Sequence, residues 1–184
     1  MKILLTGGAG YIGSVTANLF LDKGHDVYII DNLSTGNKRN LPQKAHFINC
    51  NIANNKIISK LLKKNKFDIL LHFAAFIDVE ESVKKPKKYL NNNFKNTIKL
   101  IKICEKFGLR KIIFSSTAAV YGNSRTGICS ESSKLNPLSM YASSKLQCEN
   151  FLRKKKNMKY VILRYFNVAG ADLKLRSGLI SKKK

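Results

Sequence analysis

Two residues that can act as an acid–base pair stand four positions apart in the second half of the chain. Tyr141 and Lys145 begin and end the run YASSK, and on a helix this spacing places both side chains on one face. A lysine ammonium beside a phenol stabilises the phenolate, so we expect the pKa of Tyr141 to lie below its ordinary value of about 10. Such a tyrosine can take a proton from an alcohol, and Thr117 could hydrogen-bond the same alcohol. An ordinary helix with a buried tyrosine and an exposed lysine is the alternative.

A glycine-rich loop near the N-terminus has the spacing of a phosphate-binding turn. Gly8, Gly10 and Gly13 follow a predicted strand and open a predicted helix. The early glycines permit a tight turn, Gly10 lets the backbone approach a pyrophosphate, and Gly13 lets helix and strand pack closely. The start of the helix then offers free N–H groups and the positive end of its dipole to a phosphate.

Asp31 is the second feature expected of a dinucleotide site. It ends the second predicted strand, 18 residues after Gly13. A carboxylate there accepts a hydrogen bond from the 2′-hydroxyl of an adenosine ribose and repels a 2′-phosphate, which favours NAD over NADP. Asp31 alone also suits a turn. Together with the glycine loop, however, it predicts dinucleotide binding.

The elements that must position these residues alternate along the whole chain. Strands are predicted at 2–6, 26–30, 46–49, 68–73, 111–116 and 160–164, and helices at 11–23, 54–66, 91–107 and 141–156. Apolar strands joined by helices indicate parallel βαβ crossovers. The predicted fold is therefore α/β, a Rossmann-like doubly wound parallel sheet of about six strands with helices on both faces. Ligands of such sheets bind at the carboxyl ends of the strands.

Composition limits the class of protein and its partners. The chain has 184 residues, enough for one domain, and its formal charge is +23. Such a charge can indicate nucleic-acid binding, but 28 of the 34 cations are lysine, and arginine is the residue that contacts bases and phosphates bidentately. Lys95, Lys99, Lys102 and Lys106 form a stripe on one predicted helix, as expected of a solvated face. We therefore expect no specific nucleic-acid partner.

Cysteine spacing and hydropathy indicate neither a metal site nor a membrane span. The four cysteines form no CxxC pair, and no histidine spacing typical of zinc accompanies them. No apolar run approaches the ~20 residues needed to cross a bilayer, and no signal peptide is visible at the N-terminus. We expect a cytoplasmic protein with no metal and no membrane partner.

The motifs, taken in order, resemble those of the extended short-chain dehydrogenase/reductase family. The matching segments are residues 6–14, 31–34, 72–75, 81–83, 92–93, 115–122, 141–145 and 164–171. Within that family the chain is similar to the NAD-dependent epimerases of UDP-hexoses. The resemblance implies NAD as cofactor and epimerisation at C4 of a UDP-hexose, the interconversion of UDP-glucose and UDP-galactose through a 4-keto sugar.

The resemblance also implies a role for each matching residue. Tyr141 would be the acid/base, Lys145 would hold the nicotinamide ribose and tune Tyr141, and Thr117 would assist at the sugar hydroxyl. The residues implied at the pyrophosphate are Gly7, Gly10, Tyr11, Ile12 and Gly13. Those implied at the adenosine are Asp31, Asn32, Asn51 and Ile52. Those implied elsewhere along the cofactor are Phe73, Ala74, Ala75, Asn93 and Phe166. The residues implied at the substrate are Thr117, Tyr141 and Asn167.

Departures from the family pattern leave alternatives open. Ala118 and Ala119 stand where a sugar 4,6-dehydratase carries an acidic pair, which argues against dehydration. The match ends near Asp172, so we expect residues 1–171 to form the NAD-binding domain and residues 172–184 a non-matching polar tail, with the C-terminal substrate domain absent. Positioning worth up to ~7–11 kcal/mol would then be lost, and epimerisation by this chain would be impaired.

Three other functions compete with that of a UDP-hexose epimerase. They are an inactive NAD-binding remnant or sensor, another nucleotide-sugar epimerase or dehydratase, and a basic nucleic-acid-binding protein. In relatives the helices at 91–107 and 141–156 form a dimer contact, so the resemblance also implies a homodimer.

Overall fold

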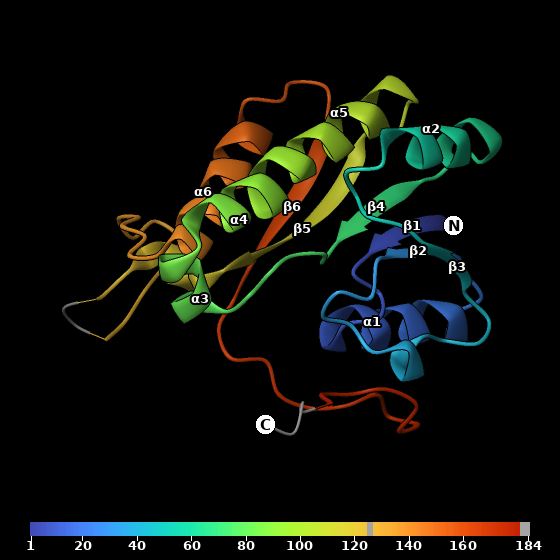
Figure 1. Cartoon of the computed structure of the whole chain (residues 1–184), viewed down its shortest axis with the longest axis horizontal. Helices are drawn as coiled ribbons and strands as arrows, with labels where there is room; N and C mark the ends of the chain where they lie inside the picture. The colour runs from blue at the N-terminus through green and yellow to red at the C-terminus, as the bar shows by residue number, and fades with distance from the viewer. Residues whose placement is uncertain (125–126, 181–184) are drawn as a thin grey trace.

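Six parallel strands form the centre of the molecule (Figure 1). The computed structural model describes residues 1–124 and 127–180. The strands are β1 (Lys2–Thr6), β2 (Asp26–Asp31), β3 (His46–Asn49), β4 (Ile69–His72), β5 (Lys111–Thr117) and β6 (Lys159–Tyr165). Their order across the sheet is β3-β2-β1-β4-β5-β6, and each neighbouring pair is parallel. This is the doubly wound order, which reverses between β1 and β4, so the predicted fold class is confirmed.

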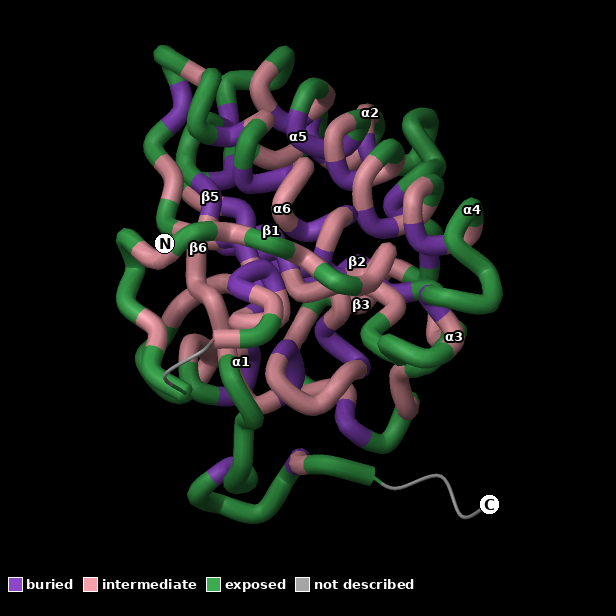
Figure 2. Tube along the Cα trace, turned by 90° about the vertical axis from the view of Figure 1, so that its left-hand side faces the viewer, coloured by how far each residue is buried: buried purple, intermediate pink, exposed green. Residues whose placement is uncertain are grey.

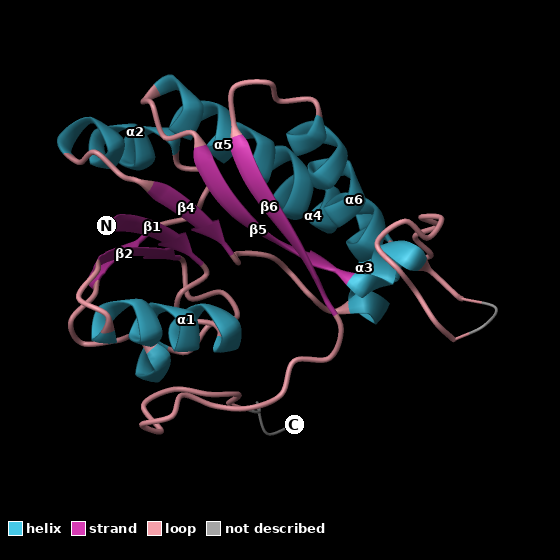
Figure 3. Cartoon of the chain, turned by 180° about the vertical axis from the view of Figure 1, so that it is seen from behind, coloured by secondary structure: helices cyan, strands magenta, loops and turns pink. Residues whose placement is uncertain are grey.

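Helices cover both faces of the sheet (Figures 1 and 3). α1 (Tyr11–Asp22) lies on one face, and α2 (Asn55–Lys64), α5 (Thr97–Lys106) and α6 (Met140–Arg153) lie on the other. Because both faces are covered, the inner strands are apolar at nearly every position. In β1, Leu5 packs toward α1 with Ala17, whereas Leu4 packs in the larger core with Leu100 of α5. Figure 2 shows the buried residues gathered along the strands and the inner sides of the helices.

The helix expected at 91–107 is longer than predicted. α4 (Pro86–Tyr89), a π-helical segment (Leu90–Asn96) and α5 follow one another without a break. Proline at the first position suits a helix start, because its missing N–H would have no partner there anyway. A short helix that was not predicted, α3 (Val79–Lys84), precedes α4. The stripe of lysines lies on the exposed side of this long helix, as predicted.

Among residues 1–124 and 127–180, no helix combines the length and the apolar character needed to span a bilayer. Two short 3-10 turns, Lys38–Asn40 and Ala118–Tyr121, follow β2 and β5 within the connections that lead away from the carboxyl ends of those strands.

The segment after β6 folds back against α1 (Figures 1 and 3). The Arg176 guanidinium donates to both carboxylate oxygens of Asp22 at 2.8 Å, and to both of Asp172 at 2.7 Å. The Asn18 amide donates to the Ser177 hydroxyl at 3.0 Å. Polar contacts therefore hold this segment on α1, and the boundary expected after residue 171 stays a prediction.

His72 forms a buried polar link at the end of β4. Its Nδ1 lies 2.7 Å from Thr6 Oγ1, its Nε2 lies 2.9 Å from Thr97 Oγ1, and its ring stacks on Phe114. Burial, assisted by the charge of Lys145, lowers the pKa of His72 to about 3. The ring is thus neutral at physiological pH, and it joins β1, β4 and α5 through hydrogen bonds.

We expect His72 to make the protein less stable in mild acid. Between pH 6.5 and about 4.5 the unfolded chain protonates this histidine while the folded chain does not. The free energy of unfolding should therefore fall by about 1.4 kcal/mol per pH unit from this group alone. Urea unfolding of the wild type and of His72→Asn across this range measures the effect. The variant's curve should be flatter, and parallel curves would contradict the assignment.

Candidate active site

The chain leaves β1 in a turn so tight that glycine is required at two positions. Gly7 has φ +78°, and a Cβ there would lie 2.6 Å from the backbone nitrogen of Ala74. A Cβ on Gly13 would lie 2.2 Å from the Gly7 carbonyl oxygen. Gly10 is the N-cap of α1 and makes no side-chain cap hydrogen bond. The first N–H groups of α1 thus have no side-chain cap, which suits them to bind an anion.

Asp31 ties the end of β2 to this turn. Its Oδ2 accepts from the Ala9 amide at 3.0 Å and its Oδ1 accepts from the Leu33 amide at 2.8 Å. Leu33 itself has φ +57°, so the carboxylate stabilises an uncommon backbone conformation. Each carboxylate oxygen has more than one lone pair, and both can accept a further hydrogen bond from a ligand hydroxyl.

All the predicted site residues except Asn93 surround one cavity of about 840 Å³ at the carboxyl ends of the strands. Those predicted for the cofactor and found in its wall are Gly7, Gly10, Tyr11, Ile12, Gly13, Asp31, Asn32, Asn51, Ile52, Phe73, Ala74, Ala75 and Phe166. Thr117, Tyr141, Lys145 and Asn167 line the same cavity. The fold thus brings the nucleotide-type residues and the acid–base residues to one place.

Lys145 is held inside the protein by the strand that ends beside it. Its side chain is on α6, is only 2 % exposed, and donates from Nζ to the Ser115 carbonyl oxygen at 2.7 Å. The ammonium also lies 5.0 Å from the centre of the Phe114 ring. Burial lowers the pKa of Lys145 to about 8, so the charged form of this amine is less favoured than that of a surface lysine.

The pKa of Tyr141 shifts in the direction opposite to the one expected. Burial raises this pKa, and a hydrogen bond with the Thr117 hydroxyl acts against the rise. The expected lowering by Lys145 is wrong for this structure because the lysine amine is engaged by the Ser115 carbonyl. Helical spacing places the two side chains on one face, but it does not determine which group the amine of a long, flexible lysine side chain contacts. The phenol is consequently protonated at neutral pH.

Comparison with known proteins agrees with this geometry. Residues 3–182 match the model of the NAD dependent epimerase/dehydratase family. The chain belongs to that family. It is 40 % identical over 175 residues to the UDP-glucose 4-epimerase of Lactobacillus helveticus and 41 % identical over 174 residues to that of Lacticaseibacillus casei. These matches cover 94 % and 93 % of this chain but 53 % of each relative, so the chain spans about half the length of the curated relatives it matches.

Solved structures of this family superpose closely on the chain. The UDP-Glc/GlcNAc 4-epimerase from Campylobacter jejuni has a TM-score of 0.87 at 44 % identity, over 92 % of this chain and 54 % of that one. The UDP-glucose 4-epimerase from Bifidobacterium longum, in complex with NAD+ and UDP, has a TM-score of 0.90 at 32 % identity, over 97 % and 57 %.

NAD, the cofactor of this family, fits the residues present. Side chains at Gly7 and Gly13 would collide with the backbone, so these glycines permit the tight turn that brings the start of α1, without a side-chain cap, to the cavity wall, where it can bind a pyrophosphate. The Asp31 carboxylate is anchored at the cavity wall and can accept from a ribose hydroxyl. Asn51 and Ile52 line the wall after β3, where the adenine was expected.

Asn93 is the one predicted cofactor residue that is not in the cavity wall. It is buried in the π-helical segment, where its side-chain amide accepts from the Phe76 N–H at 2.9 Å and donates to the Phe76 carbonyl at 2.8 Å. Its own carbonyl accepts from the Cys148 thiol. Asn93 therefore supports the wall from behind, while its neighbour Asn92 lines the cavity.

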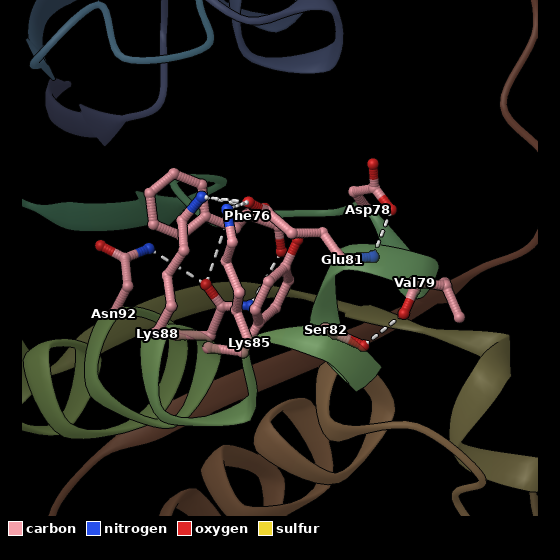
Figure 4. A network of polar contacts seen from close by, with 10 residues as sticks. Phe76, Asp78, Val79, Glu81, Ser82, Lys85, Lys88 and Asn92 are labelled. Atoms are coloured by element: carbon pink, nitrogen blue, oxygen red, sulfur yellow. Dashed lines mark hydrogen bonds and ion pairs between the residues drawn. The ribbon is translucent and has the colours of Figure 1, made fainter.

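A polar network that was not predicted fixes the segment between β4 and α4 (Figure 4). The Glu81 carboxylate accepts from Lys88 Nζ at 2.8 Å and from the Tyr89 hydroxyl at 3.0 Å, and Asp78 caps α3 by accepting from the Glu81 amide. The Lys88 ammonium lies 4.1 Å from the centre of the Phe76 ring. Since Phe76 lines the cavity, this network positions part of its wall.

Two further parts of the wall were missed by the sequence analysis. The loop after β2 contributes Ser34, Thr35, Gly36, Asn37 and Asn40. The sequence indicated only turn formers there, and the need for glycine at position 36, where a Cβ would lie 2.7 Å from that of Ala9, is visible only in the structure. Leu179 and Ile180 come from the expected tail, and no sequence pattern indicated them.

Substitution of the turn glycines should destabilise the protein by different amounts. Gly13→Ala should lower the free energy of unfolding by about 3 kcal/mol, because its Cβ meets rigid backbone. Gly10→Ala is the matched control: its Cβ would lie 3.2 Å from the Gly7 oxygen, so the loss should stay below about 1 kcal/mol. Urea unfolding without ligand measures both. Equal stabilities of the two variants would contradict the close packing of this turn.

Proposed function

We propose that this chain carries the cofactor site and the acid–base group of a UDP-sugar 4-epimerase, which inverts C4 of a UDP-hexose through a 4-keto sugar. The observation that supports this most is that Tyr141, Lys145 and Thr117 line the same cavity as the glycine turn and Asp31. Relatives that match over nearly the whole chain include the UDP-glucose 4-epimerases of Lactobacillus helveticus and Lacticaseibacillus casei, which supports the same activity.

The proposed chemistry assigns proton transfer to Tyr141. The phenol exchanges a proton with the C4 oxygen, and Thr117, which is hydrogen-bonded to the phenol, orients the sugar hydroxyl. NAD, which the glycine turn and Asp31 would hold, would supply the hydride acceptor and donor for C4. Burial disfavours the phenolate, so proton acceptance by Tyr141 requires positive charge in the cavity. The buried amine of Lys145 is the source that this chain itself provides.

The residues after Thr117 favour epimerisation over dehydration. Ala118 and Ala119 line the cavity, and neither side chain can donate or accept a proton. Elimination of water from a sugar needs an acid and a base at the carbons concerned. We also propose Asn167 and Phe166, on the segment that follows β6, as contacts of the nucleotide sugar and the cofactor, and a homodimer through the helices α5 and α6.

A second candidate is an NAD-binding chain without catalysis. The raised pKa of Tyr141 favours it, because a phenol that stays protonated cannot act as a base. The chain's coverage of only 53 % of its relatives is compatible with either function.

Calorimetric titration with NAD tests the cofactor site. We expect the purified chain to bind one NAD, and Asp31→Asn to weaken binding about tenfold, because a hydrogen bond to a charged group is worth about 1.5–3 kcal/mol. Asp26→Asn, the same charge change at the half-buried start of the same strand and outside the cavity wall, should leave the dissociation constant unchanged. A folded chain that takes up no NAD would refute the cofactor site and, with it, the epimerase.

Removal of the Tyr141 hydroxyl separates the two candidate functions. Tyr141→Phe should lower the rate of UDP-glucose and UDP-galactose interconversion by about 10²–10⁴-fold, with NAD affinity nearly unchanged. Tyr160→Phe, on β6, is the control and should keep the wild-type rate. If the wild type binds NAD but does not interconvert the sugars, the non-catalytic function is correct. Wild-type turnover by Tyr141→Phe would exclude the proposed mechanism.

A further inference from the structure

A buried carboxylate lies on α6 one turn beyond Lys145 and outside the cavity wall. Glu149 is fully buried. Its Oε1 accepts from the Ser116 hydroxyl at 2.5 Å, and its Oε2 accepts from Arg164 Nη2 at 2.6 Å, with Arg164 Nε 3.1 Å from Oε1. The Arg164 side chain is only 10 % exposed. The guanidinium and the carboxylate thus face each other as a two-pronged pair, the most directional kind of ion pair in proteins.

Arg164 extends this link to the turn that follows Thr117. Its Nη1 donates to the Tyr121 hydroxyl at 2.9 Å, and the guanidinium lies 4.9 Å from the centre of the Tyr121 ring. Arg164 belongs to β6 and Ser116 to β5. One carboxylate on α6 is therefore connected to two strands and to the turn beside the site.

Three residues of α6 contact three consecutive residues of β5. Tyr141, Lys145 and Glu149 are spaced by four, so they lie along one face of the helix. Their partners are Thr117, the Ser115 carbonyl and the Ser116 hydroxyl, in that order. A slip of α6 by one residue would move it by about 1.5 Å and turn it by about 100°, and would break all three contacts.

Apolar packing sets which face of α6 meets the sheet, because Cys148 and Leu152 are buried in the core. Apolar burial is non-directional, so the directional polar contacts add the precise alignment of the helix on β5. A buried ion pair contributes little net stability compared with apolar side chains of the same size, and one use of such a pair is to specify geometry. The Glu149–Arg164 pair has that character, because its hydrogen bonds with Ser116 and Tyr121 have defined directions and lie beside the site. The exposed Arg153, one turn further along α6, lies 3.8 Å from the same carboxylate.

We propose that Glu149 is a positioning residue: its buried pair with Arg164 sets the register of α6 on β5 and thereby keeps the Lys145 amine on the Ser115 carbonyl and Tyr141 against Thr117. The importance of those two groups rests on the proposed function, but their placement does not. Glu149 does not line the cavity, and it acts through the helix.

The accessibility of Lys145 provides a test that needs no ligand. Trace acetylation at constant pH, followed by mass-spectrometric peptide mapping, gives the labelling rate of each lysine, with exposed Lys99 of α5 as internal standard. Relative to Lys99, Lys145 of the wild type should be strongly protected. Glu149→Gln should raise its rate by about tenfold to a hundredfold, the range for loss of a hydrogen bond between charged groups.

The matched control is Glu105→Gln. Glu105 also pairs with a cation, Lys155, at 2.6 Å, and this pair joins α5 to the residues just after α6, but both side chains are about a quarter exposed, at 27 % and 23 %. Its loss should leave the labelling of Lys145 as in the wild type. If Glu105→Gln exposes Lys145 as much as Glu149→Gln does, the protection comes from general helix packing and the proposal is wrong.

A second variant covers the case in which Glu149→Gln does not fold. Glu149→Met combined with Arg164→Leu leaves no unpaired charge in the interior, so it should remain folded, as circular dichroism and cooperative melting will show. Lys145 should again become accessible in this variant. A folded variant of either kind that protects Lys145 as the wild type does would overturn the proposal. Because neither NAD nor sugar is present, failure of the epimerase function would not affect this result.

Discussion

The close approach of three backbone segments where β1 and β4 end is the constraint on which the site depends. Gly7 lies against the backbone of Phe73 and Ala74, and Gly13 lies against Gly7 itself. This approach is possible only because Gly7 and Gly13 have no side chains, and it brings the start of α1 to the point where the strand order reverses. The connections that follow β1 and β4 leave the sheet in opposite directions at that point, so a crevice forms between them. The rest of the site is arranged around this opening.

The two sides of the crevice differ in composition: one consists mainly of backbone groups and the other of side chains. The side expected to hold the cofactor consists mainly of backbone, oriented by glycines and by the Asp31 carboxylate. The side with the acid–base group consists of side chains on α6 held against β5. Backbone amides bind phosphate without any change of charge, whereas proton transfer needs groups whose protonation can change. This division explains why side-chain burial and shifted pKa values occur on the second side.

Buried polar side chains in this protein form hydrogen bonds or ion pairs with specific partners. In the part of the chain that the structure describes, every fully buried side-chain nitrogen or oxygen has a hydrogen-bond partner. His72 is held neutral between two threonines, Lys145 donates to a carbonyl, and Glu149 faces a guanidinium. An unpaired polar group there would be costly. These pairs connect helices to strands, so they determine how the covering layer sits on the sheet.

The amino-acid sequence by itself determined the fold class, the glycine turn and the place of Asp31 at the end of its strand. Apolar strands alternating with helices are a local signal, and the glycine spacing and Asp31 follow their strands directly, so nearest-neighbour physics was enough. Only the tertiary structure decided which partners the polar ends of the side chains contact. It directed the Lys145 amine to Ser115, 30 residues away, turned Asn93 toward Phe76, and joined Glu149 to Arg164. These contacts depend on how a helix rotates and slides on a sheet, and sequence periodicity specifies a helix face but not its partner.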